Sequence, residues 1–279
     1  MKLQLSLRPG LYCIATPIGN LKDITIRALE TLQSVDYILC EDTRVTAKLT
    51  SHYGIKKKLV VYNDHSSEAD RQRIISDILE GSKIGLVSDA GTPLINDPGV
   101  KLLRECHKNN CYITTLPGPS AVTAGLILSG LASHQFSFLG FFDPKSYEDL
   151  RYRPGTLIFF ESPHRLIQTL EFFKKIAENR IISVVREISK MYEDVQSGSV
   201  DALLNYYTNK PPKGEIVIVL GDLPQITLSD EHISNIIDTC LQSMSAKETT
   251  EYIKLMNRDL SKKKIYNMVL DALQKHPSK

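Results

Sequence analysis

The stretch from Ser88 to Gly99 holds the residues best suited to chemistry in this sequence, because small and turn-forming residues there accompany a carboxylate. It follows a short apolar run, Ile84 to Val87, of the length and kind expected for a buried strand. Gly91 has no Cβ, so its backbone can approach a ligand closely or adopt positive φ. Asp89 can bind a hydroxyl or an amine of such a ligand. A tight loop that only reverses the chain is the alternative.

Two other loops share this small, proline-bearing and nearly uncharged character. One runs from Thr16 to Asn20 after an apolar run, and the other runs from Leu116 to Ala121. In an open α/β sheet, ligands bind at loops that follow the carboxyl ends of strands. Such loops suit a ligand that backbone groups recognise in a close pocket, for example a nucleoside-like cofactor. The sequence lacks the dinucleotide fingerprint, the P-loop, the Gly-x-Ser-x-Gly elbow and metal-binding histidine spacings.

Strand-like and helix-like segments alternate along the first part of the chain, which predicts a parallel sheet. The predicted strands cover 11–15, 35–40, 59–62, 84–87 and 111–116. The predicted helices cover 23–34, 44–53, 68–80 and 97–106, with a fifth over 121–128. In this interpretation Asp23 caps the first helix. Asp97 caps the fourth, and Pro98 takes its first helical position.

A second set of units follows, with predicted strands over 136–142, 156–160, 181–186 and 215–220 and helices over 163–178 and 200–207. The polar segment 143–155, with Lys145, Arg151 and Arg153, is expected to be a mobile surface segment. From about Pro224 the pattern is helical, with a final helix over 261–273. The sequence thus predicts an α/β protein with an N-terminal domain over 1–118, a second α/β domain over 119–223 and a helical tail over 224–279.

The composition limits the class of protein. Of the 279 residues, 42% are hydrophobic and 24% are charged, as in an ordinary soluble globular protein. No apolar run approaches the roughly 18 residues that span a bilayer, and the N-terminus lacks a signal-peptide pattern, so a cytoplasmic protein is expected. The five cysteines form no Cys-x-x-Cys pair and are expected to be reduced. A net charge of +2 neither requires nor excludes a nucleic-acid partner.

Seven segments, taken together and in order, resemble one family. They are Ala15–Thr25, Glu41–Arg44, Val87–Gly99, Leu116–Ala121, Phe160–Arg165, Arg186–Lys190 and Lys213–Glu215. Nearly the whole chain is similar to the tetrapyrrole methylase family, in its branch that modifies small-subunit ribosomal RNA. The resemblance implies two α/β domains with S-adenosylmethionine in the cleft between them, and usually a homodimer. It also implies 2′-O-methylation of a cytidine in the decoding region of 16S ribosomal RNA, with no metal.

The family motifs imply a cofactor site in this sequence. The predicted cofactor-binding residues are Pro17, Ser88, Asp89, Gly91, Thr92, Ser120, Ala121, Phe160 and Ile216. Pro17 is expected near the methionine end of the cofactor. Phe160 and Ile216 are expected to close around the adenine.

Methylating a ribose 2′-hydroxyl needs in-line placement and usually a base, because the hydroxyl is a poor nucleophile at neutral pH. Lys190 is a candidate base if Arg186 or desolvation lowers its pKa. Glu187 is another candidate, or it orients the lysine. Asp89, on the central loop, is the third predicted catalytic residue. A solvated, charged strand end is the alternative for Lys190 and Glu187.

Four basic side chains are the predicted RNA contacts. Arg44 either holds a phosphate or pairs with one of the two carboxylates just before it. His65 contacts the nucleotide or caps a turn. His164 and Arg165 open a helix whose N-terminus favours phosphate, with a structural tie between domains as the alternative. The branch often has Asn-Glu after the first of these histidines, where this chain has Ser66-Ser67.

Three functions remain open at this level. The first is 2′-O-methylation of ribosomal RNA, and the second is methylation of a tetrapyrrole or another small molecule by a relative of the same fold. RNA dependence of methyl transfer separates these two. The third is a non-catalytic ribosome-binding protein, which binds small subunits without S-adenosylmethionine. The basic tail from Lys247 to Lys264 fits the first and third better, although such charges also solvate a helix face.

Overall fold

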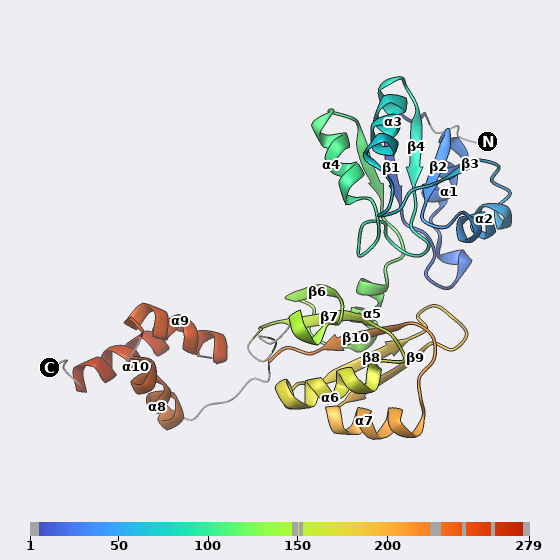
Figure 1. Ribbon diagram of the computed structural model, residues 1–279. Helices are drawn as coiled ribbons and strands as arrows, with labels where there is room; N and C mark the ends of the chain where they lie inside the picture. Colours follow the sequence, from blue (N-terminus) through green and yellow to red (C-terminus); the bar gives the residue numbers. More distant parts are fainter. Residues whose placement is uncertain are drawn as a thin grey trace.

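The computed structural model describes residues 6–146, 150, 153–223, 230–241, 244–257 and 260–275. The described chain forms two α/β domains, each built on a five-stranded sheet, and a group of helices at its C-terminal end (Figure 1). The predicted fold class is therefore confirmed. None of the described helices is long and apolar enough to cross a membrane.

The first sheet contains only parallel strands, in the order β3-β2-β4-β1-β5. Its strands are β1 (Gly10–Ile14), β2 (Tyr37–Cys40), β3 (Lys58–Val61), β4 (Lys83–Leu86) and β5 (Ile113–Leu116). The connecting helices are α1 (Ile26–Ser34), α2 (Thr43–His52), α3 (Glu68–Leu79) and α4 (Val100–Lys108). Each helix returns the chain to the same edge of the sheet. All five strands therefore end at one common edge.

Side chains of β1 alternate between the two faces of the first sheet. Leu11 packs in a core with residues of α3 and α4, whereas Ile14 packs in a core with residues of α1. Helices thus cover both faces of this sheet (Figure 1). A strand covered on both sides is apolar throughout, and all five residues of β1 are buried.

The second sheet is mixed, in the order β6-β7-β10-β8-β9. Its strands are β6 (Phe136–Phe141), β7 (Thr156–Glu161), β8 (Ile182–Arg186), β9 (Asp194–Gly198) and β10 (Ile216–Leu220). The central strand β10 is antiparallel to both of its neighbours, β7 and β8. At the edges, β9 is antiparallel to β8, and β6 is parallel to β7.

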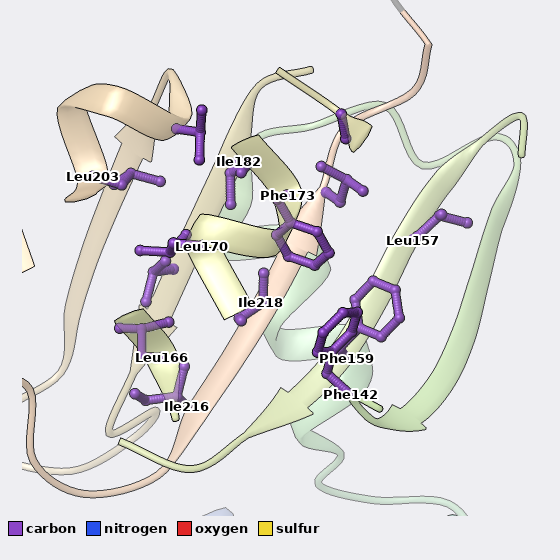
Figure 2. Close-up of a cluster of buried hydrophobic side chains, with 14 of the residues drawn as sticks. Phe142, Leu157, Phe159, Leu166, Leu170, Phe173, Ile182, Leu203, Ile216 and Ile218 are labelled. Carbon is purple, nitrogen blue, oxygen red and sulfur yellow. The ribbon is translucent and has the colours of Figure 1, made fainter. Parts of the chain in front are cut away.

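Helices also cover both faces of the second sheet. On one face, α6 (Leu166–Ile176) and α7 (Val200–Asn209) enclose a core that includes Phe142, Phe159 and Phe173 (Figure 2). On the other face, α5 (Ala121–Ser129) packs against the sheet. Gly125 lets α5 approach β10 closely, because a Cβ at this position would lie 2.7 Å from Cγ1 of Val217.

Three helices form the C-terminal group: α8 (Asp230–Cys240), α9 (Ala246–Met256) and α10 (Lys262–Lys275). They pack on one another around a small core of Ile233, Ile237, Ile253, Ile265 and Val269. This group lies apart from both sheets (Figure 1). The predicted final helix over 261–273 is present as α10.

Two predicted helix starts are wrong. α4 begins at Val100 instead of Pro98, because Gly99 adopts a φ of 131° immediately before it, and no side chain caps the helix. Asp23 does not cap α1. The side chain of Thr25 does so, and Asp23 ends a separate 3₁₀ turn.

The second domain differs further from its predicted pattern. The sequence pattern does not predict β9, since its only aliphatic residue is Val195. In segment 143–155, Leu150 is fully buried, and the guanidinium of Arg180 donates hydrogen bonds to the carbonyl oxygens of Leu150 and Arg153. The prediction of a surface segment is therefore wrong at Leu150. Arg151, which was included in that prediction, lies outside the described residues.

Candidate functional site

A cleft of about 560 Å³ lies between the two α/β domains, and this volume suits a small-molecule ligand. The first domain contributes the loops after β1, β2 and β4. The second contributes the start of α5, the ends of β6 and β7, the loop after β8 and the start of β10. The lining residues include Ile18, Glu41, Gly91, Thr92, Asn96, Asp97, Ser120, Ala121, Phe141, Phe160, Glu161, Ile188, Glu215 and Ile216.

Backbone hydrogen bonds hold the loop after β4 to the loop after β1. The N–H of Thr16 donates to the carbonyl oxygen of Gly91 at 2.9 Å, and the N–H of Gly91 donates to that of Thr16 at 3.0 Å. Gly91 has a φ of 82°, and a Cβ there would lie 3.3 Å from Cγ2 of Ile18, so this position favours glycine. The hydroxyl of Thr92 donates to the carbonyl oxygen of Pro119 at 3.0 Å, which ties this loop to the start of α5.

Two carboxyl groups on the first-domain side of the cleft have raised pKa values. Burial raises the pKa of Glu41, and the nearby charges of Asp89 and Asp97 raise it further. Burial likewise raises the pKa of Asp97, and the charge of Asp89 raises it further. A hydrogen bond with Ser88 lowers this pKa, but the overall shift is upward. Crowded carboxylates are stabilised by a nearby cation. This side of the cleft therefore favours a ligand that carries positive charge.

The antiparallel placement of β10 brings three segments of the second sheet to the cleft. Ile216, the first residue of β10, pairs with Glu161 at the end of β7 and with Arg186 at the end of β8. Phe160 and Phe141 make an edge contact, with ring centroids 5.7 Å apart. The second-domain side of the cleft is therefore largely apolar and aromatic, and such a surface favours a flat ring.

Glu161 is buried at the end of β7, and donors surround its carboxylate. It accepts hydrogen bonds from the hydroxyl of Thr169 at 2.5 Å and from the N–H of Ser162 at 2.7 Å. The guanidinium of Arg165 forms an ion pair with the same carboxylate, at 2.9 Å from Oε1 of Glu161. Arg165 thus fixes the turn after β7, which lines the cleft. This ion pair is a tie within the second domain.

A network of charged groups holds the loop after β8. The ammonium of Lys190 donates to Oε1 of Glu187 at 2.7 Å and to Oε2 of Glu215 at 3.0 Å. Desolvation lowers the pKa of Lys190, but the hydrogen bonds with both carboxylates outweigh it, and the pKa is raised overall. Desolvation raises the pKa of Glu187, but bonds from Lys190 and from the Glu215 N–H lower it overall. The condition under which Lys190 would be a base, a lowered pKa, is therefore not met, and the pair is ionised at neutral pH.

Close contacts join the two domains beside the cleft. A Cβ on Gly19, in the first domain, would lie 2.6 Å from Cγ of Lys190. A Cβ on Gly140, in β6, would lie 2.9 Å from Oδ1 of Asn96 in the loop after β4. Glycine at both positions lets the domains approach this closely.

Two loops at the cleft contain non-glycine residues with positive φ. They are Leu94 at 71°, Asn96 at 66°, Glu187 at 52° and Ser189 at 67°. Each such residue costs about 1–3 kcal/mol and persists only where surrounding contacts enforce it. Ser189 is held in this way, since its hydroxyl donates a hydrogen bond to Asp23 of the first domain. Strain concentrated beside a cleft is typical of a functional site.

Most of the predicted cofactor residues line this one cleft, namely Gly91, Thr92, Ser120, Ala121, Phe160 and Ile216. Pro17, Ser88 and Asp89 do not line it. Ser88 is buried, and its hydroxyl donates to the carbonyl oxygen of Ala90 at 3.3 Å. Asp89 is exposed and accepts a hydrogen bond from the N–H of Asp42 at 3.1 Å. Ser88 and Asp89 thus shape the loop that carries Gly91.

None of the four predicted RNA contacts lines the cleft. The guanidinium of Arg44 donates to both carboxylate oxygens of Asp42, to Oδ2 at 2.6 Å and to Oδ1 at 3.0 Å. These hydrogen bonds lower the pKa of Asp42 to about 2. The predicted ion pair of Arg44 is therefore confirmed, although its side chain is 87% exposed. His65 is exposed, and its N–H donates to Oδ1 of Asn63 within a turn. His164 is exposed in the turn before α6.

Sequence reasoning missed several of the lining residues. Asp97 was interpreted only as a helix cap, and Glu41 only as a partner for Arg44. Glu161 and Glu215 stood inside recognised motifs, but the alternation of strands and helices does not predict that β10 pairs with β7 in an antiparallel sense. Among the described residues, no group of three or more His, Cys, Asp and Glu side chains could hold a metal ion.

The sequence has known relatives over nearly its whole length. Residues 10–204 match the family model of the tetrapyrrole (corrin/porphyrin) methylases. The chain is 43% identical to ribosomal RNA small subunit methyltransferase I of Rickettsia prowazekii, over 94% of this chain and 97% of that protein. It is 38% identical to the protein of the same name from Synechocystis sp., over 90% of this chain and 95% of that protein.

Solved structures share the fold at lower identity. Cobalt precorrin-4 methyltransferase has 18% identity and a TM-score of 0.58, over 76% of this chain and 94% of that one. Uroporphyrin-III-C-methyltransferase from Thermus thermophilus has 19% identity and a TM-score of 0.55, over 77% of this chain and 96% of that one. Likeness at this level of identity concerns the fold alone.

Proposed function

The chain belongs to the tetrapyrrole methylase family, and from that premise we propose that its cleft binds S-adenosylmethionine for 2′-O-methylation of a cytidine in small-subunit ribosomal RNA. Relatives named ribosomal RNA small subunit methyltransferase I align with it over 94% and 90% of its length, which supports RNA as the substrate class. Methylation of a tetrapyrrole has support from the description of the family model and from structures at 18% and 19% identity, whereas the relatives at 43% and 38% identity are named for ribosomal RNA.

The observation that carries this proposal is the meeting of Gly91, Ser120, Phe160 and Ile216, from two domains, on one cleft. The chemistry of the lining residues fits S-adenosylmethionine. The aromatic and aliphatic side suits the adenine, and the glycine loop presents backbone groups to polar atoms. The carboxylates on the first-domain side suit a ligand with a positive sulfur and an ammonium group.

S-adenosylmethionine supplies a methyl group that the positive sulfur already activates. The protein must place the 2′-hydroxyl in line with that methyl group. Lys190 is protonated at neutral pH, and the Glu187 carboxylate is ionised and hydrogen-bonded, so neither is a free base. We assign both residues to positioning, because they hold the loop after β8 against Glu215, which lines the cleft. Placement, more than base catalysis, then accounts for the rate.

Asp89 has a comparable positioning role in this proposal. Its carboxylate accepts the N–H of Asp42 and so ties the loop after β4 to the loop after β2. The loop after β4 contains Gly91, and the loop after β2 contains Glu41. Both residues line the cleft. Removing the Asp89 carboxylate would loosen two segments of the site at once.

The substrate in this proposal is 16S ribosomal RNA within the small subunit, so the enzyme acts in the cytoplasm. His65 and Arg44 follow β3 and β2 at the same edge of the first sheet as the cleft, which supports a contact of His65 with RNA. Arg44 pairs with Asp42, but its side chain is exposed, so a phosphate can still reach it. The homodimer implied by the family resemblance stays a prediction, and light scattering of the purified protein tests it.

The test is methyl transfer from labelled S-adenosylmethionine to small ribosomal subunits purified from a strain that lacks this protein. We expect incorporation at the 2′-oxygen of one cytidine, located by mapping the modified ribose. A parallel reaction with a tetrapyrrole acceptor serves as the comparison. Methylation of the tetrapyrrole but not of RNA would contradict the proposal. Binding of subunits without binding of S-adenosylmethionine would instead favour a non-catalytic ribosome-binding protein.

A further inference from the structure

A second, smaller cavity adjoins the cleft. It has a volume of about 190 Å³ and shares the lining residue Asp97 with the cleft. The turn after β3, together with residues near the starts of α3 and α4, forms its walls. Pockets for complete small molecules typically measure about 300–1,000 Å³. A cavity of this size beside a larger one therefore suits one part of a long ligand.

Three cationic side chains line this cavity: Arg71, Lys101 and Arg104. Arg71 is half-buried and fixed in position, because its guanidinium donates to the carbonyl oxygen of Ser66 at 2.9 Å. Lys101 and Arg104 are exposed, and neither forms an ion pair or a side-chain hydrogen bond with the residues that the structure describes. Since they are three residues apart on α4, they lie on the same face of that helix. Cations without partners around a cavity attract an anionic group.

The same cavity also carries hydrogen-bond acceptors, from Asp64, Asp97 and Asn63. A bare phosphate would gain from the cations but would be repelled by the two carboxylates. A sugar–phosphate unit satisfies both kinds of group, because its phosphate faces cations and its ribose hydroxyls donate to carboxylates. The mixture of charges therefore favours a ribonucleotide backbone over a free anion.

We propose that this cavity binds the sugar–phosphate backbone of ribosomal RNA beside the nucleotide that is methylated in the cleft. The inference rests on the proposed function, because only an RNA acceptor extends a chain of nucleotides from one cavity into the next. Lys101, Arg104 and Arg71 hold the phosphate. Asp64 accepts hydrogen bonds from the ribose, and Asp97 lies where the cavity meets the cleft.

Two variants on α4 test the cavity, Lys101→Ala and Arg104→Ala. Lys108→Ala is the matched control, because it removes the same charge at the far end of the same helix, where Lys108 pairs with Glu105. Binding of small ribosomal subunits is measured over a range of salt concentrations, and binding of S-adenosylmethionine is measured by calorimetry. We expect each cavity variant to weaken subunit binding about tenfold and to lower the salt slope by about one. Affinity for S-adenosylmethionine should stay unchanged in all variants.

Each other outcome overturns the proposal in a different way. Subunit affinity equal to that of the parent protein in both variants, with methyl transfer intact, would remove the cavity from the RNA site and leave the proposed function standing. Loss of affinity for S-adenosylmethionine would show that the cations hold the carboxylate of its methionine. A parent protein that binds no RNA at all would overturn both this inference and the proposed function. Thermal unfolding of each variant confirms that it folds.

Discussion

The two α/β domains bring residues to the cleft by different routes. In the first domain all strands are parallel, so the loops that follow them share one edge of the sheet. In the second, β10 runs against β7 and β8, so the start of one strand lies beside the ends of two others. Residues at both ends of strands therefore reach the site in the second domain. In the first domain only the carboxyl ends do so.

The loops of the two domains are also held by different interactions. Two main-chain hydrogen bonds join Thr16 and Gly91 in the first domain. In the second, ionic side chains hold the segments at or near the cleft, for example Glu161 with Arg165 and Glu187 with Lys190. Main-chain bonds survive side-chain replacement, whereas a buried ionic group leaves its partners unsatisfied when it is removed. Side-chain changes should therefore affect the second domain more strongly.

The largest effect is expected for Arg180→Met in the second domain. The guanidinium is buried and donates to four carbonyl oxygens, those of Leu150, Arg153, Gly155 and Gly221. Burial lowers its pKa to about 10, so it remains charged at neutral pH. Methionine keeps the volume but leaves the carbonyls without this donor. We expect a loss of about 3–5 kcal/mol in the free energy of unfolding, measured by scanning calorimetry.

Thr16→Val is the matching change in the first domain. It removes one side-chain hydrogen bond, from Thr16 to the carbonyl oxygen of Ser88 at 3.3 Å, and keeps the main-chain pair. We expect a loss of about 1 kcal/mol or less. Equal losses in the two variants would contradict the distinction between the domains.

Much of the first domain could be predicted from the sequence, and for a physical reason. Strands covered on both faces are continuous apolar runs, as in β1 and β4, and their spacing by helices fixes a parallel arrangement. The small-residue loops then stand at strand ends, where a ligand binds. The start of α4 was wrong because Asp97 and Pro98 form a good helix start locally, whereas the positive φ of Gly99 depends on surrounding packing.

A smaller effect, on cofactor binding, is expected for Gly91→Ala. The substitution places a Cβ at a φ of 82° and 3.3 Å from Ile18, in a residue that lines the cleft. We expect the affinity for S-adenosylmethionine to fall at least about tenfold, because backbone strain and the added methyl group both disturb the loop. Titration calorimetry measures this affinity.

Gly54→Ala provides the control for that prediction. Gly54 has a similar φ of 65°, but a Cβ there would meet no atom within 4 Å. We expect it to lower stability by about 1 kcal/mol and to leave cofactor affinity unchanged. An equal loss of affinity in both variants would mean that general destabilisation, and not the cleft, causes the effect.

A loss of about tenfold in kcat is expected for Lys190→Ala. The ion pairs of Lys190 with Glu187 and Glu215 position the loop after β8, and alanine removes both. Lys190→Arg keeps the charge and the donors, so it should retain kcat within about threefold, with an unchanged pH profile. If Lys190 were instead the base, both variants would lose activity equally, since arginine does not release its proton.

The network around Lys190 also shows why much of the site was hidden in the sequence. Lys190 and Glu187 are close along the chain and were recognised, but Glu215 belongs to another strand. Its position depends on β10 lying between β7 and β8 in an antiparallel sense, which the alternation of strands and helices does not encode. A lowered pKa of Lys190 was the condition for its role as a base, and the hydrogen bond with Glu215, together with the one to Glu187, is what raises the pKa instead.

The smallest effect is a dependence of cofactor affinity on pH, set by the first domain. Burial raises the pKa values of Glu41 and Asp97, so the folded chain binds these protons more tightly than the unfolded chain. Their ionisation therefore lowers folding stability as pH rises through the raised values. A bound cation offsets this loss of stability, and it binds only when the two carboxyl groups are ionised. We expect affinity for S-adenosylmethionine to fall as pH drops from neutral toward the raised pKa values of these two carboxyl groups.

Calorimetric titration over this pH range measures that dependence, and Glu41→Gln is the variant to compare. The amide cannot ionise, so the variant should bind less tightly at neutral pH and should show a flatter profile. Lys190→Arg, in the second domain, should keep the profile of the parent protein. A parent profile that is flat, or one that Glu41→Gln leaves unchanged, would show that the acidic side of the cleft does not bind the positive charge. The aromatic side would then carry most of the affinity.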